Sequence, residues 1–135
     1  PGRLTLIHRM GAALLEQHLG PLIDAVEHAG ALVLWLCDPM HGNTRTLPCG
    51  TKTRAFDDIL AEIESAFAVH AWHGSVLGGL HLELTAEPVT ECLGGPGQLQ
   101  PEDLHRCYLS KVDPRLNGEQ ALALAQHLSR MPPCR

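Results

Sequence analysis

The stretch Ala31-Leu-Val-Leu-Trp-Leu-Cys37 is apolar throughout and lies between Gly30 and the pair Asp38-Pro39. It is far shorter than the roughly 20 apolar residues that a membrane-spanning helix needs. A short apolar run bounded by Gly and Pro is typical of a strand covered on both faces, as in a parallel sheet. A buried helical segment is the weaker alternative at this length, so we predict a central parallel strand.

Residues on the N-terminal side of this run predict one strand and one helix. Leu4 to Ile7 are apolar and β-inclined, which predicts a short strand. Residues 12–28 carry apolar side chains at steps of three and four, which predicts a helix with one buried stripe. Gly20 and Pro21 predict a kink or a break in that helix.

Residues on the C-terminal side continue the alternation. Residues 41–50 are rich in Gly, Asn, Thr and Pro, which predicts a loop, and Phe56 to Phe67 show helical spacing. Residues 80–85 alternate strictly between apolar and polar types, which predicts a third strand. Pro101 predicts the start of a short helix, and residues 119–130 predict a final one.

This order predicts an α/β protein with parallel strands. A (β/α)8 TIM barrel typically needs about 250 residues, so 135 residues would supply only its C-terminal portion, about three β/α units plus a C-terminal helix. We therefore interpret residues 1–135 as the C-terminal part of a single barrel domain whose N-terminal part is absent. The start at Pro1, without an initiator Met or a secretory pattern, is consistent with a cut end.

The composition of the chain indicates which binding partners and which cellular compartment to expect. A net charge of −5 and a pI near 6.0 argue against nucleic acid or an anionic membrane as the partner, because both favour an excess of Lys and Arg. The 5 cysteines are odd in number, irregular in spacing and without a Cys-x-x-Cys pair. This pattern indicates reduced cysteines in an intracellular protein, so we expect a cytoplasmic location.

Polar residues follow the predicted strands, where the loops of parallel α/β proteins place their functional groups. Arg9 follows the first strand, Asp38 and His41 follow the second, and Glu83 lies near the end of the third. A carboxylate within an apolar strand is costly to bury unless a metal, a cation or a proton pairs with it. Asp113 is either a third ligand or a turn residue before proline.

An imidazole with two carboxylates suits a divalent ion such as Mn, Fe or Co better than it suits Zn. Arg9, Lys52 and Arg54 are the candidates for phosphate binding, since guanidinium offers a planar fork and ammonium a mobile charge. The alternative for these three residues is a solvated, charged face.

Six motifs resemble, in the same order, those of class II 3-deoxy-D-arabino-heptulosonate 7-phosphate (DAHP) synthases. They are Leu4-Thr-Leu-Ile-His-Arg-Met-Gly11, Cys37-Asp-Pro-Met-His-Gly-Asn-Thr44, Lys52-Thr-Arg54, Gly78-Gly-Leu-His-Leu-Glu-Leu-Thr85, Val89-Thr-Glu-Cys-Leu-Gly-Gly95 and Asp113-Pro-Arg-Leu-Asn117. Together they cover nearly the whole chain. The stretch between Asn43 and Lys52 and the turn at residues 86–88 depart from the family's usual sequence.

The resemblance implies that His41, Glu83 and Asp113 bind a divalent metal, most often Mn, with Co or Fe as alternatives. It implies that Arg9 holds phosphoenolpyruvate and that Lys52 is an active-site lysine on the substrate side. The family's fourth ligand, a cysteine from an early strand, has no counterpart in this sequence. The implied reaction condenses phosphoenolpyruvate with erythrose 4-phosphate to DAHP and phosphate, the first step of the shikimate pathway, in a homo-oligomeric full-length enzyme.

Two alternatives stay open. One is part of a different aldolase-type barrel, which product analysis would distinguish. The other is a non-catalytic fragment or a regulatory pseudo-enzyme chain that pairs with another polypeptide. Because the cysteine ligand is missing, we expect this chain alone to be incomplete as an enzyme.

Overall fold

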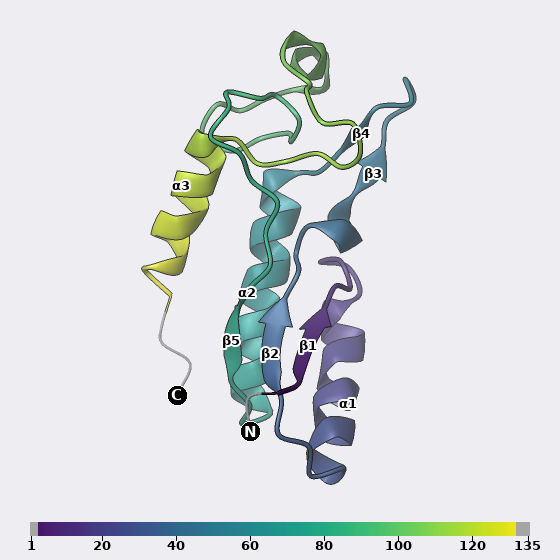
Figure 1. The fold of residues 1–135 in the computed structure, drawn as a ribbon, viewed down its shortest axis with the longest axis vertical. Helices are drawn as coiled ribbons and strands as arrows, with labels where there is room; N and C mark the ends of the chain where they lie inside the picture. The colour runs from purple at the N-terminus through teal and green to yellow at the C-terminus, as the bar shows by residue number, and fades with distance from the viewer. Residues whose placement is uncertain (1–2, 132–135) are drawn as a thin grey trace.

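A computed structural model describes residues 3–131 as a small parallel sheet with helices on one face and long loops at one end (Figure 1). The helices and strands are β1 (Thr5–His8), α1 (Leu15–His28), β2 (Leu34–Cys37), η1 (His41–Asn43), β3 (Arg45–Thr46), β4 (Lys52–Thr53), α2 (Phe56–Trp72), β5 (Leu77–Leu80), η2 (Pro101–Arg106) and α3 (Gly118–Leu128). The predicted central strand is thus confirmed as β2, which begins at Leu34.

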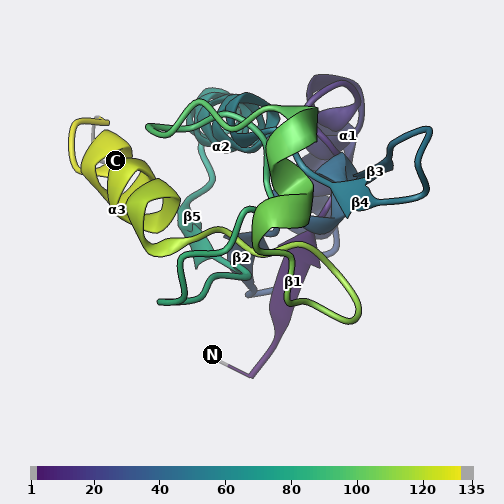
Figure 2. The same ribbon diagram turned by 90° about the horizontal axis from the view of Figure 1, so that it is seen from above.

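The sheet has the order β1-β2-β5, and both pairings are parallel. Within this sheet, each strand lies beside the next one in sequence. The helices α1 and α2 lie in the crossover connections between the parallel strands. Figures 1 and 2 show both helices on the same face of the sheet. The α/β class and the parallel arrangement that the sequence predicts are confirmed.

The core has two parts because α2 is long enough to contact both the sheet and the loops. The first part lies between the sheet and the two helices and contains Leu15, Leu19, Ile23, Trp35, Cys37, Ala66 and Leu77. The second joins the N-terminal half of α2 to α3 and to the loops beyond β5, and it contains Met40, Phe56, Ile59, Ile63, Cys92, Leu116 and Leu124. The second part fixes those loops against the helix layer.

The third strand lies earlier than the alternation of residues 80–85 predicts, so that prediction is wrong in its boundaries: β5 is Leu77–Leu80. Gly78 and Gly79 occupy the strand because the Leu34 and Leu36 side chains of β2 fill the space where a Cβ would lie. Glu83 therefore lies beyond the strand, and its side chain is 30% exposed, in place of the buried strand position that we expected.

Two other expectations change. Pro21 does not break α1, which is one helix. Proline cannot donate to the Gln17 carbonyl, but both residues lie on the exposed side of the helix, where water can take the place of the missing donor. The predicted loop at residues 41–50 contains the single turn η1 and, with the residues after it, the short antiparallel hairpin of β3 and β4.

The cysteines in the described part of the chain, Cys37, Cys49, Cys92 and Cys107, are free, as the sequence predicts. Cys134 and the first residue, Pro1, lie outside the described residues. Within residues 3–131, none of the helices is both long and apolar enough to cross a membrane.

Candidate metal centre at the carboxyl end of the sheet

The carboxyl ends of β1 and β2 point toward the loop-rich end of the molecule (Figures 1 and 2). Because the strands are parallel, the loops that follow them meet there. Arg9 directly follows β1, Asp38 directly follows β2, and the chain after β5 reaches the same end at Glu83.

Asp38 orients His41. Asp38 is buried, and its Oδ1 accepts the backbone N–H groups of Met40 at 3.0 Å and His41 at 3.2 Å. Its Oδ2 lies 2.6 Å from Nδ1 of His41. A carboxylate at Nδ1 places the proton on that nitrogen and leaves the lone pair of Nε2 free, which is the arrangement of many metal-binding histidines.

Arg54 holds Glu83 from inside the protein. The Arg54 side chain is fully buried, and its NH1 lies 2.5 Å from Oε2 of Glu83. Its Nε donates to the Thr44 hydroxyl at 2.8 Å, and NH1 also donates to the carbonyl of Pro114. The guanidinium therefore connects the segment after η1 with the loops that carry Glu83 and Asp113.

Asp113 approaches through backbone pairing of two distant segments. The N–H of Leu116 donates to the Glu83 carbonyl at 3.0 Å, and the N–H of Thr85 donates to the Leu116 carbonyl at 2.9 Å. Lys52 Nζ lies 3.0 Å from Oδ1 of Asp113, and this hydrogen bond lowers the pKa of the Asp113 carboxyl. Asp113 is thus held as a carboxylate.

His41, Glu83 and Asp113 converge, as the sequence predicts. One ligand atom from each residue lies within 4.8 Å of the other two, and His41 Nε2 is 3.5 Å from Oε1 of Glu83. The three side chains are partly exposed, so a cation and a substrate can reach them. One imidazole and two carboxylates form a donor set that fits a hard-to-borderline divalent ion.

The other predicted residues surround this cluster at different depths. The Lys52 side chain is about half exposed and contacts Asp113. Arg9 is exposed at the end of β1. Arg54 is buried against Glu83, so its geometry supports a role in positioning the Glu83 carboxylate. Direct phosphate binding by Arg54 stays a prediction.

A network behind the cluster joins the loop after β1 to the turn after β2. The buried carboxylate of Glu62, on α2, accepts the backbone N–H groups of Met10 at 3.1 Å and Gly11 at 3.0 Å. Asn43 donates to Glu62 at 2.7 Å. Gly11 has a φ of +80°, and a Cβ there would lie 2.7 Å from the carbonyl oxygen of Gly42, so the two loops touch backbone to backbone. The positions of Arg9 and His41 are therefore coupled.

Glu91 supports the loop that carries Asp113. Its buried carboxylate accepts the backbone N–H groups of Leu109, Ser110 and Arg115 at 2.8–3.0 Å. The Arg115 guanidinium adds contacts at 2.8 and 3.1 Å. Sequence reasoning assigned no role to Glu91 or Glu62, although a carboxylate amid apolar neighbours such as Val89 and Cys92 is the signal that could have found Glu91.

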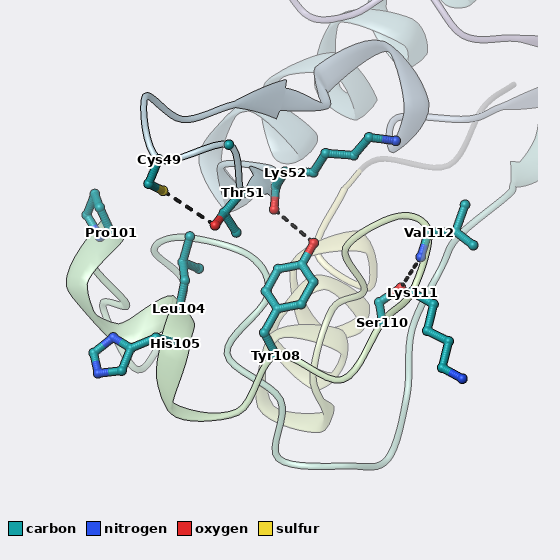
Figure 3. A pocket seen from close by; sticks show the side chains of 11 residues that line it. Cys49, Thr51, Lys52, Pro101, Leu104, His105, Tyr108, Ser110, Lys111 and Val112 are labelled. Carbon is teal, nitrogen blue, oxygen red and sulfur yellow. Dashed lines mark hydrogen bonds between the residues drawn. The ribbon is translucent and has the colours of Figure 1, made fainter.

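The pocket in Figure 3, of about 650 Å³, borders this region without containing the cluster. Lys52, Tyr108 and Ser110 are among its lining residues, and the Tyr108 hydroxyl donates to the Lys52 carbonyl at 2.9 Å. The Lys52 ammonium group points away from Tyr108 (Figure 3), toward Asp113. Lys52 therefore lies between the pocket and the metal-ligand cluster.

Comparison with known proteins identifies the family of the chain. Residues 1–129 match the Class-II DAHP synthetase family. The chain belongs to this family. It is 48% identical over 131 residues to the phospho-2-dehydro-3-deoxyheptonate aldolase of Streptomyces coelicolor, covering 97% of this chain and 29% of that protein. It is 47% identical over 131 residues to the phospho-2-dehydro-3-deoxyheptonate aldolase AroG of Mycolicibacterium smegmatis, covering 97% of this chain and 28% of that protein.

An Asp38→Asn variant tests whether the Asp38 carboxylate orients His41 in this member of the DAHP synthetase family. An Asp38→Asn side chain can keep its oxygen on the Met40 and His41 N–H groups only by turning its NH2 group toward Nδ1 of His41. The proton of the imidazole then moves to Nε2 and blocks the lone pair that would bind a metal. We expect the metal affinity of the full-length protein to fall by roughly 10–100-fold in a calorimetric titration.

The matched control for Asp38→Asn is Asp103→Asn, since Asp103 contacts Gln100 and Arg106 on η2, within a different loop. This control should leave the metal affinity unchanged. Equal affinities of the Asp38 variant and the unaltered protein would show that Asp38 does not orient a ligand.

Proposed function

We propose that the full-length protein containing this chain is a DAHP synthase that condenses phosphoenolpyruvate with erythrose 4-phosphate to DAHP and phosphate, at the entry to the shikimate pathway. The observation that carries the proposal is the convergence of His41, Glu83 and Asp113 in a chain of the class II family. The chain spans less than a third of the length of the two relatives it matches.

His41, Glu83 and Asp113 would hold a divalent metal, Mn in first place and Co or Fe as alternatives. When bound, such an ion supplies Lewis-acid polarisation of a carbonyl oxygen. The chain's own residues prepare this site: Asp38 sets the tautomer of His41, Arg54 fixes the angle of Glu83, and Lys52 keeps Asp113 ionised.

Arg9 and Lys52 supply positive charge beside these carboxylates. Both substrates are phosphate esters that repel each other, so their approach requires cations held at defined positions. Arg9 offers a forked contact for the phosphate of phosphoenolpyruvate, and Lys52 offers a mobile charge on the substrate side. Their exposure at the strand-end loops supports this assignment.

The sheet supports a (β/α)8 barrel in the full-length protein. Both crossover helices lie on one face, whereas doubly wound sheets carry helices on both (Figure 2). Ile7 and Leu34, on the opposite face, are 46% and 47% exposed within the described residues. Further strands of the barrel would cover them. We place the enzyme in the cytoplasm and expect a homo-oligomer.

The proposed function is tested by measuring phosphate release from phosphoenolpyruvate by the full-length protein. We expect release to require both erythrose 4-phosphate and a divalent metal, and to stop when a chelator is added. The isolated 135-residue chain should release none, because its sheet is incomplete. No release by the metal-loaded full-length protein would favour the regulatory pseudo-enzyme.

Arg9→Ala should weaken the binding of phosphoenolpyruvate and leave the binding of the other ligands unchanged. Loss of a charge-assisted contact costs about 1.5–3 kcal/mol, so KM for phosphoenolpyruvate should rise by roughly tenfold to a hundredfold. KM for erythrose 4-phosphate and the metal affinity should change little. Arg106→Ala, on the surface of η2, is the control. An unchanged KM in the Arg9 variant would contradict its role.

A further inference from the structure

A second cluster of metal-ligand types lies between the sheet and α2. His8 and Cys37 end β1 and β2, and they are direct partners in the parallel register. Glu62 approaches them from α2, and one ligand atom of each of the three residues lies within 4.8 Å of the others. All three residues are buried. The cluster therefore combines an imidazole, a thiol and a carboxylate from three separate elements.

Within the described residues, His8 lacks hydrogen-bond partners, and Glu62 is hydrogen-bonded but lacks a cation. Neither ring nitrogen of His8 has a hydrogen-bond partner within the described residues, although the residue is only 4% exposed. An unpaired buried donor costs about 1–3 kcal/mol. Glu62 accepts hydrogen bonds from neutral groups only, so its buried carboxylate has no cation beside it in the described part of the chain.

One divalent cation would give one ring nitrogen of His8 a partner and would place positive charge beside the Glu62 carboxylate. Burial lowers the pKa of His8 to about 4, so its imidazole is neutral at pH 7 and offers a lone pair. A cation displaces the proton of the Cys37 thiol to solvent, and the resulting thiolate and the Glu62 carboxylate together balance a charge of +2. The donor atoms lie within 4.8 Å of one another, and donors bound tetrahedrally to Zn²⁺ at about 2.0–2.3 Å are about 3.3–3.8 Å apart, so binding would draw the three side chains together.

We propose that His8, Cys37 and Glu62 form a second metal site, selective for a thiophilic divalent cation such as Zn²⁺. It differs from the cluster at His41 in place and burial: the His41 cluster is partly exposed at the loop end, whereas His8, Cys37 and Glu62 are buried between the sheet and α2. A metal there would tie β1 and β2 to α2 beneath the loops that carry Arg9 and His41, with its fourth position left to a water molecule. It does not depend on the proposed enzymatic activity.

The test uses the full-length protein, produced in medium supplemented with Co²⁺, which replaces Zn²⁺ and gives a thiolate-to-cobalt absorption band. His41→Ala weakens the first cluster as a source of bound metal, and the comparison of Cys37→Ser with Cys92→Ser assigns any remaining band. In that background we expect about one Co²⁺ per chain and a charge-transfer band. Adding Cys37→Ser should remove the band and the bound metal. Adding Cys92→Ser, which changes another buried cysteine outside the cluster, should preserve both.

Wild-type crystals grown with Zn²⁺ make the test independent of how the variants fold. Anomalous scattering at the zinc edge should give a peak within bonding distance of His8, Cys37 and Glu62. Anomalous density at the first cluster alone, with a water molecule or no density between these three residues, would overturn the proposal. So would a cobalt band that persists in the Cys37 variant.

Discussion

Replacing Glu83 with Ala in the full-length protein is expected to reduce metal-dependent phosphate release by on the order of a thousandfold. A metal that polarises a carbonyl contributes several kcal/mol to the transition state, and each 1.36 kcal/mol corresponds to a tenfold change in rate. Glu83 contributes one of the three converging ligand atoms. Its loss also leaves the buried guanidinium of Arg54 without its carboxylate partner.

Two measurements separate these effects of Glu83→Ala. Metal content after dialysis should fall with activity, and a Glu83→Gln variant should keep the fold, as judged by thermal unfolding, while it still loses metal. Glu87→Ala, an exposed carboxylate in the same connection, should keep metal and activity. Full metal occupancy in both Glu83 variants would exclude Glu83 as a ligand.

The second large effect concerns stability. Glu91→Gln is expected to lower the free energy of unfolding by about 1–3 kcal/mol, because it turns an NH2 group toward donors that the buried carboxylate now accepts. The Asp113 loop should be affected first, since Glu91 holds Leu109 and Ser110. Urea unfolding of the full-length protein measures the loss, with Glu87→Gln as the exposed control.

The pH dependence of stability gives an independent check on Glu91. Burial alone raises the pKa of this carboxyl, but hydrogen bonds from Arg115 and from the loop N–H groups outweigh burial and lower it. A depressed pKa contributes stability above the unfolded value of about 4.3, and this contribution is lost as the pH falls through the folded pKa. Glu91→Gln should therefore flatten the acid side of the stability profile. An unaltered acid limb would contradict the assignment.

Local pattern was sufficient for the elements that bury a continuous apolar face. The run that ends at Cys37 and the helical spacing from Phe56 to Phe67 each correspond to an observed element, since period and length are properties of the chain itself. Polar residues after the strands also predicted that His41, Glu83 and Asp113 would meet, because parallel strands bring their carboxyl ends to one edge.

Local pattern failed where the packing of neighbours decided the outcome. The strand at Leu77–Leu80 contains two glycines that sequence alone reads as a breaker, and only the leucines of β2 explain their place. Likewise, nothing near Arg54 in the sequence indicates that its guanidinium is buried against Glu83.

The sequence by itself determined the parallel α/β order and the identity of the candidate ligands, because these depend on residue type and spacing along the chain. Only the tertiary structure decided which groups support them: Asp38 on His41, Lys52 on Asp113 and Glu91 beneath the loop after η2. The physical reason is that a buried charge needs a partner in space. That partner is 29 residues away in the case of the buried Arg54 and Glu83, beyond the reach of any local pattern.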